Sequence, residues 1–332
     1  MKKNGKTIAK IVFIIIIILL LIYAVKDSLP QIVAEVLDTA WYTVALIVVA
    51  TVVYHIIEGV ITTNFARIYN PEFTFVNGIM CACCASFYRV ATLGSGAGVA
   101  AVCFLNKHGI KAHDATGMYM IQYVLHKLSI AVFSGIFALI NMRCIMRTFS
   151  KYTGVLSAGY ALTAVVVVLL VALCVSTHFH RLCLWLLRKL DIKHKNAEKI
   201  QTVEEYFNNL KEATKAYEGR KFLLLKQLLI NMVKLSCWYI IPYIILHDSG
   251  INVLNSLSVT SIATVLAGVL PTPAGIGSME FVYTTLFTEL TGTVNAASSV
   301  LLYRFATYVL PCILGGIVLL AYNSYRKRKV EL

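Results

Sequence analysis

Charged side chains are scarce in this chain of 332 residues, since only 14% are Asp, Glu, Lys or Arg whereas 58% are hydrophobic. Soluble domains carry about 25% charged and about 45–50% apolar residues. The charges are also segregated: residues 11–25 contain none, and residues 188–221 hold most of the soluble-looking sequence. This pattern excludes a cytosolic enzyme and a nucleic-acid-binding module, and it predicts a polytopic helical membrane protein.

Acidic residues are fewer than basic ones, with 16 Asp and Glu against 30 Lys and Arg. In a membrane protein this surplus is typical of the positive-inside bias. A basic cytoplasmic face also attracts anionic lipids.

Motifs for nucleotide binding and hydrolysis are missing. The sequence has no P-loop, dinucleotide fingerprint, His-Glu-x-x-His or Gly-x-Ser-x-Gly motif. Among the nine cysteines, Cys81, Cys83 and Cys84 cluster, but no His or acid stands beside them at metal-ligand spacing. We interpret them as small apolar residues, and we expect no catalytic residues, no metal site, no disulfide framework and no cofactor.

Six apolar segments are long enough to cross a bilayer as helices. They are residues 8–25, 40–62, 115–140, 153–176, 222–246 and 295–322. The first resembles a signal peptide, with lysines before an apolar core. No small-residue cleavage site follows it, so we expect a retained membrane helix.

Two further apolar stretches, 75–106 and 252–290, are each broken at the centre by sequence that cannot continue a helix. The breaks are Leu93-Gly-Ser-Gly-Ala-Gly98 and Leu270-Pro-Thr-Pro-Ala-Gly-Ile-Gly277. Backbone freed at membrane depth must lie inside protein or face a wet cavity. Each stretch therefore either crosses once as an interrupted helix or turns back as a hairpin.

The distribution of Lys and Arg favours two hairpins. With both stretches as hairpins and the N-terminus inside, 21 of the 30 basic residues face the cytoplasm and 4 face outside. A single crossing would instead place residues 177–221 or the basic tail 323–332 outside, against the positive-inside rule. We therefore expect a multi-pass protein of the cell (plasma) membrane with cytoplasmic N- and C-termini and with residues 177–221 in the cytoplasm.

The two halves, 1–152 and 153–322, then share the order helix, helix, hairpin, helix. Three crossings per half give them opposite orientations, and the tips align over seven residues, Leu93–Val99 with Leu270–Ile276. We expect an all-α polytopic membrane protein with about six full transmembrane helices and two re-entrant broken-helix hairpins in an inverted repeat. Residues 177–221 are expected to form a cytoplasmic amphipathic segment.

The second break is the most informative stretch for function. A helix that begins near Gly277 exposes free N–H groups and a positive dipole end, which suit a phosphate or carboxylate. Glu280 either caps this helix or, as an ionisable group at membrane depth, binds an ammonium or a proton. An ammonium on Glu280 would favour a zwitterionic or cationic phospholipid over a purely anionic one.

Arg304 lies inside the last apolar segment and needs a partner, which is either Glu280 or a lipid phosphate. Arg89, four residues before the first tip, matches it in the other half. The candidate substrate-binding residues are Pro271, Thr272, Pro273, Gly275, Gly277, Ser278, Glu280, Arg304, Arg89, Ser95, Gly96 and Gly98. Further polar groups at membrane depth are His55, Glu58, His126, Lys127, Lys226 and Lys234.

The stretch Leu270-Pro-Thr-Pro-Ala-Gly-Ile-Gly-Ser-Met-Glu280 resembles the Pro-x-Pro-Gly-Gly-x-Gly-x-x-Glu signature of the lysylphosphatidylglycerol synthase transmembrane region, also called the flippase-like domain family. The segment from Leu302 to Gly316 also looks like the last helix of that family. Ala274 stands where the family usually has glycine, and the first tip, with no nearby acid, is the poorer match.

This resemblance implies a lipid flippase or a lipid-handling membrane domain. In full-length synthases the region precedes a soluble domain that transfers lysine from lysyl-tRNA to phosphatidylglycerol. Here the chain ends at Leu332, directly after the last helix, so we expect that domain and its transferase activity to be absent.

Three hypotheses follow. The first is a flippase for a phospholipid, such as aminoacylated phosphatidylglycerol (for example lysylphosphatidylglycerol), or for a lipid-linked headgroup. The second is a membrane subunit, or truncated homologue, of phosphatidylglycerol lysyltransferase that works with a separately encoded aminoacyltransferase. The third is a secondary transporter of a small solute. The expected partners are anionic or aminoacylated membrane phospholipids and not nucleic acid, and a homo-oligomer is compatible with all three.

Overall fold

A computed structural model describes residues 29–190, 197–217, 219–270, 272 and 275–331. Within these ranges all regular structure is helical and no strand occurs. Five segments are long and apolar enough to span a membrane: Trp41–Ala66, Ala112–Ile140, Ser150–Cys174, Lys221–Ser249 and Thr293–Ala321. The expected all-α polytopic membrane fold is therefore confirmed, while the expected first helix, 8–25, lies outside the described residues.

The first half contains two of these spans and one hairpin of shorter helices. Its elements are α2 (Leu29–Asp38), α3 (Trp41–Ala66), α4 (Phe75–Ala91), α5 (Ala97–Lys107), α6 (Ala112–Ile140), α7 (Met142–Thr148) and the 3-10 turn η1 (Ser150–Tyr152). The short helices α2 and α7 lie in the connections that follow the expected helices 8–25 and 115–140. The broken stretch 75–106 forms α4 and α5, with the break at the expected place.

The second half repeats this order with more interruptions. Its elements are α8 (Thr153–Val175), α9 (Thr177–Leu190), α10 (Ala197–Lys215), α11 (Lys221–Tyr239), α12 (Ile241–Leu246), η2 (His247–Ser249), α13 (Val253–Val269), α14 (Ser278–Thr291), α15 (Thr293–Arg304), the π-helical segment η4 (Phe305–Val309) and α16 (Leu310–Glu331). The expected span 222–246 is divided where Pro242 stands in the first turn of α12. The expected basic tail after residue 322 continues α16.

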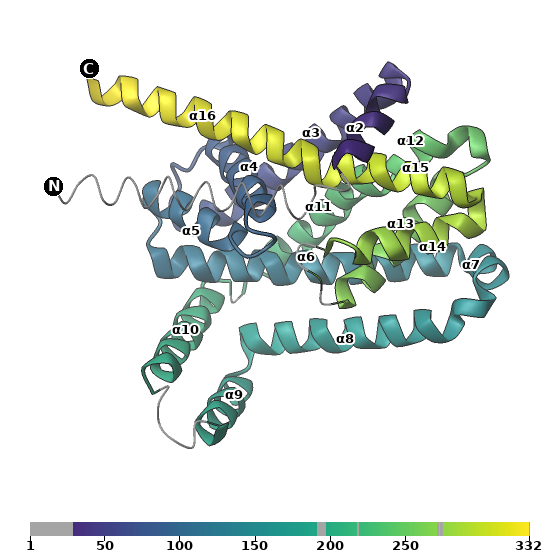
Figure 1. The fold of residues 1–332 in the computed structure, drawn as a ribbon. Coiled ribbons are helices and arrows are strands. Elements are labelled where there is room, and N and C mark those ends of the chain that lie inside the picture. Colours follow the sequence, from purple (N-terminus) through teal and green to yellow (C-terminus); the bar gives the residue numbers. More distant parts are fainter. Residues whose placement is uncertain (1–28, 191–196, 218, 271, 273–274, 332) are drawn as a thin grey trace.

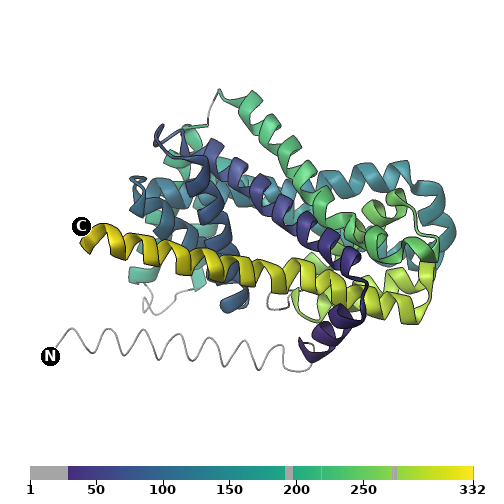
Figure 2. The same ribbon diagram turned by 90° about the horizontal axis from the view of Figure 1, so that it is seen from above.

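The two hairpins enter the bundle from opposite ends. Figures 1 and 2 show α4 and α5 at the end where α16 terminates, and α13 and α14 at the other end, beside α12. The ends of these helices that flank the two breaks lie near the middle of the bundle, between the long helices (Figure 1).

Small residues allow the first hairpin to approach its neighbours closely. A Cβ added at Gly78 on α4 would collide with the backbone carbonyl of Gly59 on α3. A Cβ added at Gly315 on α16 would collide with the carbonyl of Cys83 on α4. Close backbone approach of this kind stabilises helix pairs where apolar burial gives little driving force. It fixes α4 between α3 and α16 and so fixes the first tip.

Helices α8, α9 and α10 lie at the edge of the bundle (Figure 1). On α9 the apolar side chains Leu182, Trp185 and Leu186 are exposed, and Arg188 forms an ion pair with Glu204 of α10 at 2.8 Å. Exposed Trp and Leu beside basic residues suit a helix in the membrane interface. This arrangement agrees with the amphipathic segment expected from the sequence.

The opposed hairpins generate a prediction about orientation. Single cysteines placed at Lys215, at the end of α10, and at Gly292, between α14 and α15, should react with an impermeant maleimide from opposite sides of the membrane in an otherwise cysteine-free protein. Both positions are exposed. Lys215 belongs to the strongly basic segment that the positive-inside rule places in the cytoplasm. Labelling of both from one side would contradict the opposed arrangement.

Candidate substrate-binding site

The second tip is held in shape by glycine geometry and a hydroxyl contact. Gly275 and Gly277 have φ values of 70° and 83°, which residues with a Cβ rarely adopt. The hydroxyls of Thr272 and Ser278 lie 2.7 Å apart and close the turn between α13 and α14. Of the other predicted tip residues, Pro271 and Pro273 lie outside the described residues.

Glu280 and Arg304 meet at this tip. The Arg304 guanidinium donates from Nε to Oε1 and from a terminal nitrogen to Oε2 of Glu280, both at 2.6 Å. Arg304 is only 7% exposed, and it also donates to the carbonyl of Gly275. A bidentate pair of this kind offsets the cost of two charges in a largely buried setting. Of the two partners considered for Arg304, the structure places Glu280 beside it.

The Glu280 carboxylate also caps α14. Its Oε2 accepts a hydrogen bond from the Gly277 amide at 2.8 Å, which satisfies one of the free N–H groups at the helix start. Both oxygens are therefore engaged, by Arg304 and by the helix cap. These hydrogen bonds use three of the about four lone-pair sites of the carboxylate, so Oε1, which accepts only from Arg304 among the residues that the structure describes, is the oxygen left for an ammonium.

The first tip is built differently and carries no acid. Leu93 and Gly94 both have positive φ, 51° and 103°. The amide of Gly96 donates to the Thr92 hydroxyl at 2.5 Å, and the Ser95 hydroxyl donates to the Thr92 carbonyl at 2.9 Å. Two predicted site residues, Ser95 and Gly96, thus stabilise their own turn. A Cβ at Gly98 would press on the Tyr119 ring at 3.0 Å, so Gly98 permits close packing of α5 on α6.

Arg89 joins the first hairpin to the last membrane helix. Pro311 has no N–H, so the Thr307 carbonyl four residues earlier lacks its usual α-helical donor. Arg89 supplies a donor at 3.3 Å, and the Thr51 hydroxyl donates to the neighbouring Ala306 carbonyl at 3.1 Å. The π-helical segment η4 is thus stabilised by side chains of α3 and α4. Such segments are frequent at functional sites.

Two adjoining cavities lie between the tips and the long helices. The tip chamber, of about 440 Å³, is lined by Gly94 of the first tip, by Thr272 and Gly275 of the second, and by Arg304. The polar chamber, of about 270 Å³, lies between α3, α4, α6 and α11, and its wall includes Glu58, Gln122, His126 and Lys234. The walls that the chambers share contain Tyr54, Arg89, Gly94, Tyr123, His126 and Lys127.

Two cations at the junction of the chambers have no acidic partner. Within the part of the chain that the structure describes, no carboxylate lies within ion-pair distance of Arg89 or Lys127. Arg89 lies 5.8 Å from the centre of the Trp238 ring, and Lys127 lies 5.6 Å from that of Tyr123. Aromatic faces stabilise such cations only partly. The shared wall therefore attracts an anion.

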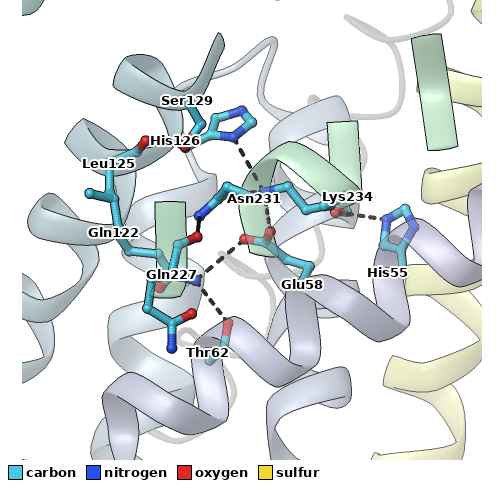
Figure 3. Close-up of polar contacts among 11 residues, drawn as sticks. His55, Glu58, Thr62, Gln122, Leu125, His126, Ser129, Gln227, Asn231 and Lys234 are labelled. Atoms are coloured by element: carbon cyan, nitrogen blue, oxygen red, sulfur yellow. Dashed lines mark hydrogen bonds and ion pairs between the residues drawn. The ribbon is translucent and has the colours of Figure 1, made fainter. Parts of the chain in front are cut away.

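A second ion pair, between Glu58 and Lys234, was not predicted from the sequence. Lys234 of α11 contacts Glu58 of α3 at 2.5 Å and is 2% exposed along its side chain (Figure 3). Gln122 of α6 donates weakly to the other Glu58 oxygen at 3.4 Å and to Thr62 at 3.0 Å. The sequence did contain a signal for this pair: one acid, Glu58, and several lysines lie in separate membrane spans. Opposite charges at membrane depth usually form pairs with one another. His55, on the same helix face as Glu58, instead bonds Thr51 and Ser86.

A double-mutant cycle tests the coupling of Glu280 and Arg304. Glu280→Gln leaves a buried guanidinium without its anion and should destabilise the protein by about 3–5 kcal/mol, and Arg304→Gln should act similarly. The double variant should lose less stability than the sum, as measured by thermal unfolding in detergent. Strict additivity would contradict the pairing.

The control is the exposed pair of Lys151 and Glu289, 2.7 Å apart, whose Lys151 side chain is 59% exposed. The same substitutions there should change stability by about 1 kcal/mol or less.

Comparison with known proteins agrees with this architecture. No curated protein matches the chain. A family model described as the lysylphosphatidylglycerol synthase TM region matches residues 7–315, which include both hairpins, Glu280 and Arg304. The chain therefore belongs to the lysylphosphatidylglycerol synthase transmembrane region family.

Proposed function

We propose that this protein moves a phosphate-bearing lipid headgroup between the two leaflets of the membrane through the tip chamber and the polar chamber. The observation that carries the proposal is the pair of cations, Arg89 and Lys127, which line the junction of these cavities without a carboxylate partner among the described residues. A cation at membrane depth is costly and is usually retained for function. A phosphodiester supplies the anion that both cations lack.

The hairpin geometry supports a path rather than a closed site. The tips enter from opposite ends and both line the tip chamber, so a group inside this chamber contacts both repeats. Helix α14 begins at Ser278 and contributes Met279 to the chamber wall, so the positive end of its dipole lies beside this cavity. Sites at the meeting point of broken helices from two opposed halves are typical of transporters.

The membership in a lipid-related membrane family supports a lipid rather than a small solute as the substrate. The surplus positive charge supports a headgroup with a net anionic phosphate. Aminoacylated phosphatidylglycerol, which carries both a phosphate and an ammonium, remains a candidate headgroup within this proposal. The ammonium would then contact Oε1 of Glu280, which within the described ranges accepts only from Arg304, or an acceptor in the chamber wall.

Leaflet exchange in proteoliposomes tests the proposal. The purified protein should accelerate exchange of fluorescent phosphatidylglycerol, lysylphosphatidylglycerol or phosphatidylethanolamine, followed by the fraction of label that a membrane-impermeant reductant destroys. Lys127→Gln should slow this exchange at least about tenfold, because a charge-assisted hydrogen bond contributes about 1.5–3 kcal/mol. Lys127 is the sharper probe, since Arg89→Gln also removes the donor to Thr307.

Lys226→Gln is the matched control, because Lys226 is an exposed lysine of the neighbouring helix α11 and lines neither chamber. It should exchange lipid at the wild-type rate. The proposal fails if the wild type moves no lipid of this panel, or if Lys127→Gln exchanges as fast as the wild type. Uptake of small solutes by the same proteoliposomes, or capture of a separate aminoacyltransferase, would then support the other two hypotheses.

A further inference from the structure

The Lys234 ammonium is fully occupied by hydrogen bonds. It donates to Glu58 Oε2 at 2.5 Å, to Asn231 Oδ1 at 2.7 Å and to His126 Nδ1 at 3.2 Å. An ammonium has three N–H donors and no acceptor, so these three contacts use all of them. Figure 3 shows the three partners arranged around the lysine nitrogen. As an ammonium, Lys234 is therefore held in one position by these three contacts.

His126 cannot take up a proton at the nitrogen that faces Lys234. The ammonium only donates, so Nδ1 of His126 has to accept, and the ring is neutral with its proton on Nε2. A proton on Nδ1 would place two donors against each other 3.2 Å apart. His126 thus helps to fix the lysine and is not the site at which the network gains a proton.

Glu58 differs from its neighbours because one of its oxygens is nearly free. Oε2 is bound by Lys234, whereas Oε1 has only the long 3.4 Å contact with Gln122. The Glu58 side chain is 26% exposed and lies in the wall of the polar chamber. A carboxylate oxygen with access to a cavity and without a strong donor is the natural place for a proton.

The charges that face Glu58 decide when a proton can stay there. Lys234 of α11 touches it, and Arg89 of α4 and Lys127 of α6 line the same chamber. The remaining titratable groups of this wall are the phenols of Tyr54, Tyr119 and Tyr123, the Cys81 thiol and the His126 ring. Phenols and thiols are ordinarily neutral near pH 7. Three cations against one carboxylate repel a proton. An anion bound at Arg89 and Lys127 removes the share of this repulsion that these two cations contribute, while Lys234 keeps its own.

We propose that Glu58 binds one proton whenever an anionic phosphate headgroup occupies the chambers, so that the protein moves the headgroup together with H⁺. This inference rests on the proposed function. A hydronium ion in the chamber gives its proton to Oε1 of Glu58, an O–H bond forms, and water is left. One negative charge enters with the phosphodiester and one positive charge with the proton, so the loaded cavity has the same net charge as the empty one. Lys234 keeps its bonds to Asn231 and His126 throughout.

Binding of proton and headgroup must then be reciprocal, because two ligands that favour each other do so by the same factor. Short-chain phosphatidylglycerol should bind the purified protein about tenfold more tightly at pH 5.5 than at pH 8, as measured by calorimetry. Glu58→Gln, which imitates the protonated carboxyl, should bind with the tighter affinity at both pH values. Affinity of the wild type that does not change with pH would overturn the proposal.

A pH gradient gives the decisive test, because it needs no variant that might misfold. Proteoliposomes that contain a trace of fluorescent phosphatidylglycerol should, with one pH unit across the membrane, accumulate the lipid about tenfold in the leaflet facing the more alkaline side. This ratio follows because one pH unit corresponds to about 1.36 kcal/mol for each proton moved. The random orientation of the inserted protein does not alter it.

Glu289→Gln provides the matched control. Glu289 is 25% exposed and is paired with a lysine, as Glu58 is, but it lines neither chamber. This variant should keep the full gradient-driven accumulation, whereas Glu58→Gln should exchange lipid without accumulating it. Exchange by the wild type with equal leaflet populations under the gradient would overturn proton coupling and leave the flippase proposal intact. Absence of exchange by the wild type would overturn both.

Discussion

Backbone groups that are freed within the membrane must find partners inside the protein, and the centre of this molecule is organised around that requirement. Arg304 donates to the Gly275 carbonyl at the second tip, and Glu280 accepts from the Gly277 amide at the same turn. Arg89 donates to the Thr307 carbonyl that Pro311 leaves without a helical donor. These charged side chains therefore have a structural role, because they satisfy backbone groups that lack helical partners. These contacts stabilise both the second tip and the π-helical segment η4.

This structural role accounts for the excess of cations over carboxylates in the walls of the two cavities. Glu280 offsets Arg304, and Glu58 offsets Lys234, so two of the four cations that line the two cavities are compensated. Arg89 binds a carbonyl dipole and Lys127 lies over an aromatic ring, and neither contact cancels a full charge. A cavity wall with two uncompensated cations carries a net positive charge, which an anion in the cavity would offset. Under the proposed function, the residues that stabilise the protein would also bind the phosphate.

Sequence reasoning located what is local and missed what depends on the packing of distant helices. The breaks after Leu93 and Leu270, the opposed hairpins and the meeting of Glu280 with Arg304 follow from Pro and Gly positions, from the charge distribution and from the need of a buried charge for a partner. The Glu58–Lys234 pair could not be assigned, because the sequence places one acid and several lysines in separate spans and does not show which helix faces meet. Pro311 was visible, yet its effect on Thr307 depends on Arg89, which lies 218 residues away.

The last membrane helix joins the two tips mechanically. Arg304 holds the second tip from the final turn of α15, and three residues later Thr307 holds Arg89 beside the first tip. The π-helical segment η4 begins directly after Arg304, includes Thr307 and is followed by Pro311, which cannot donate an α-helical hydrogen bond. Movement of either tip away from the cavities would have to break a bond to this helix or carry the helix along. A group that binds between the tips therefore acts on both halves of the protein through one segment, which is what coupled opening and closing of two opposed hairpins requires.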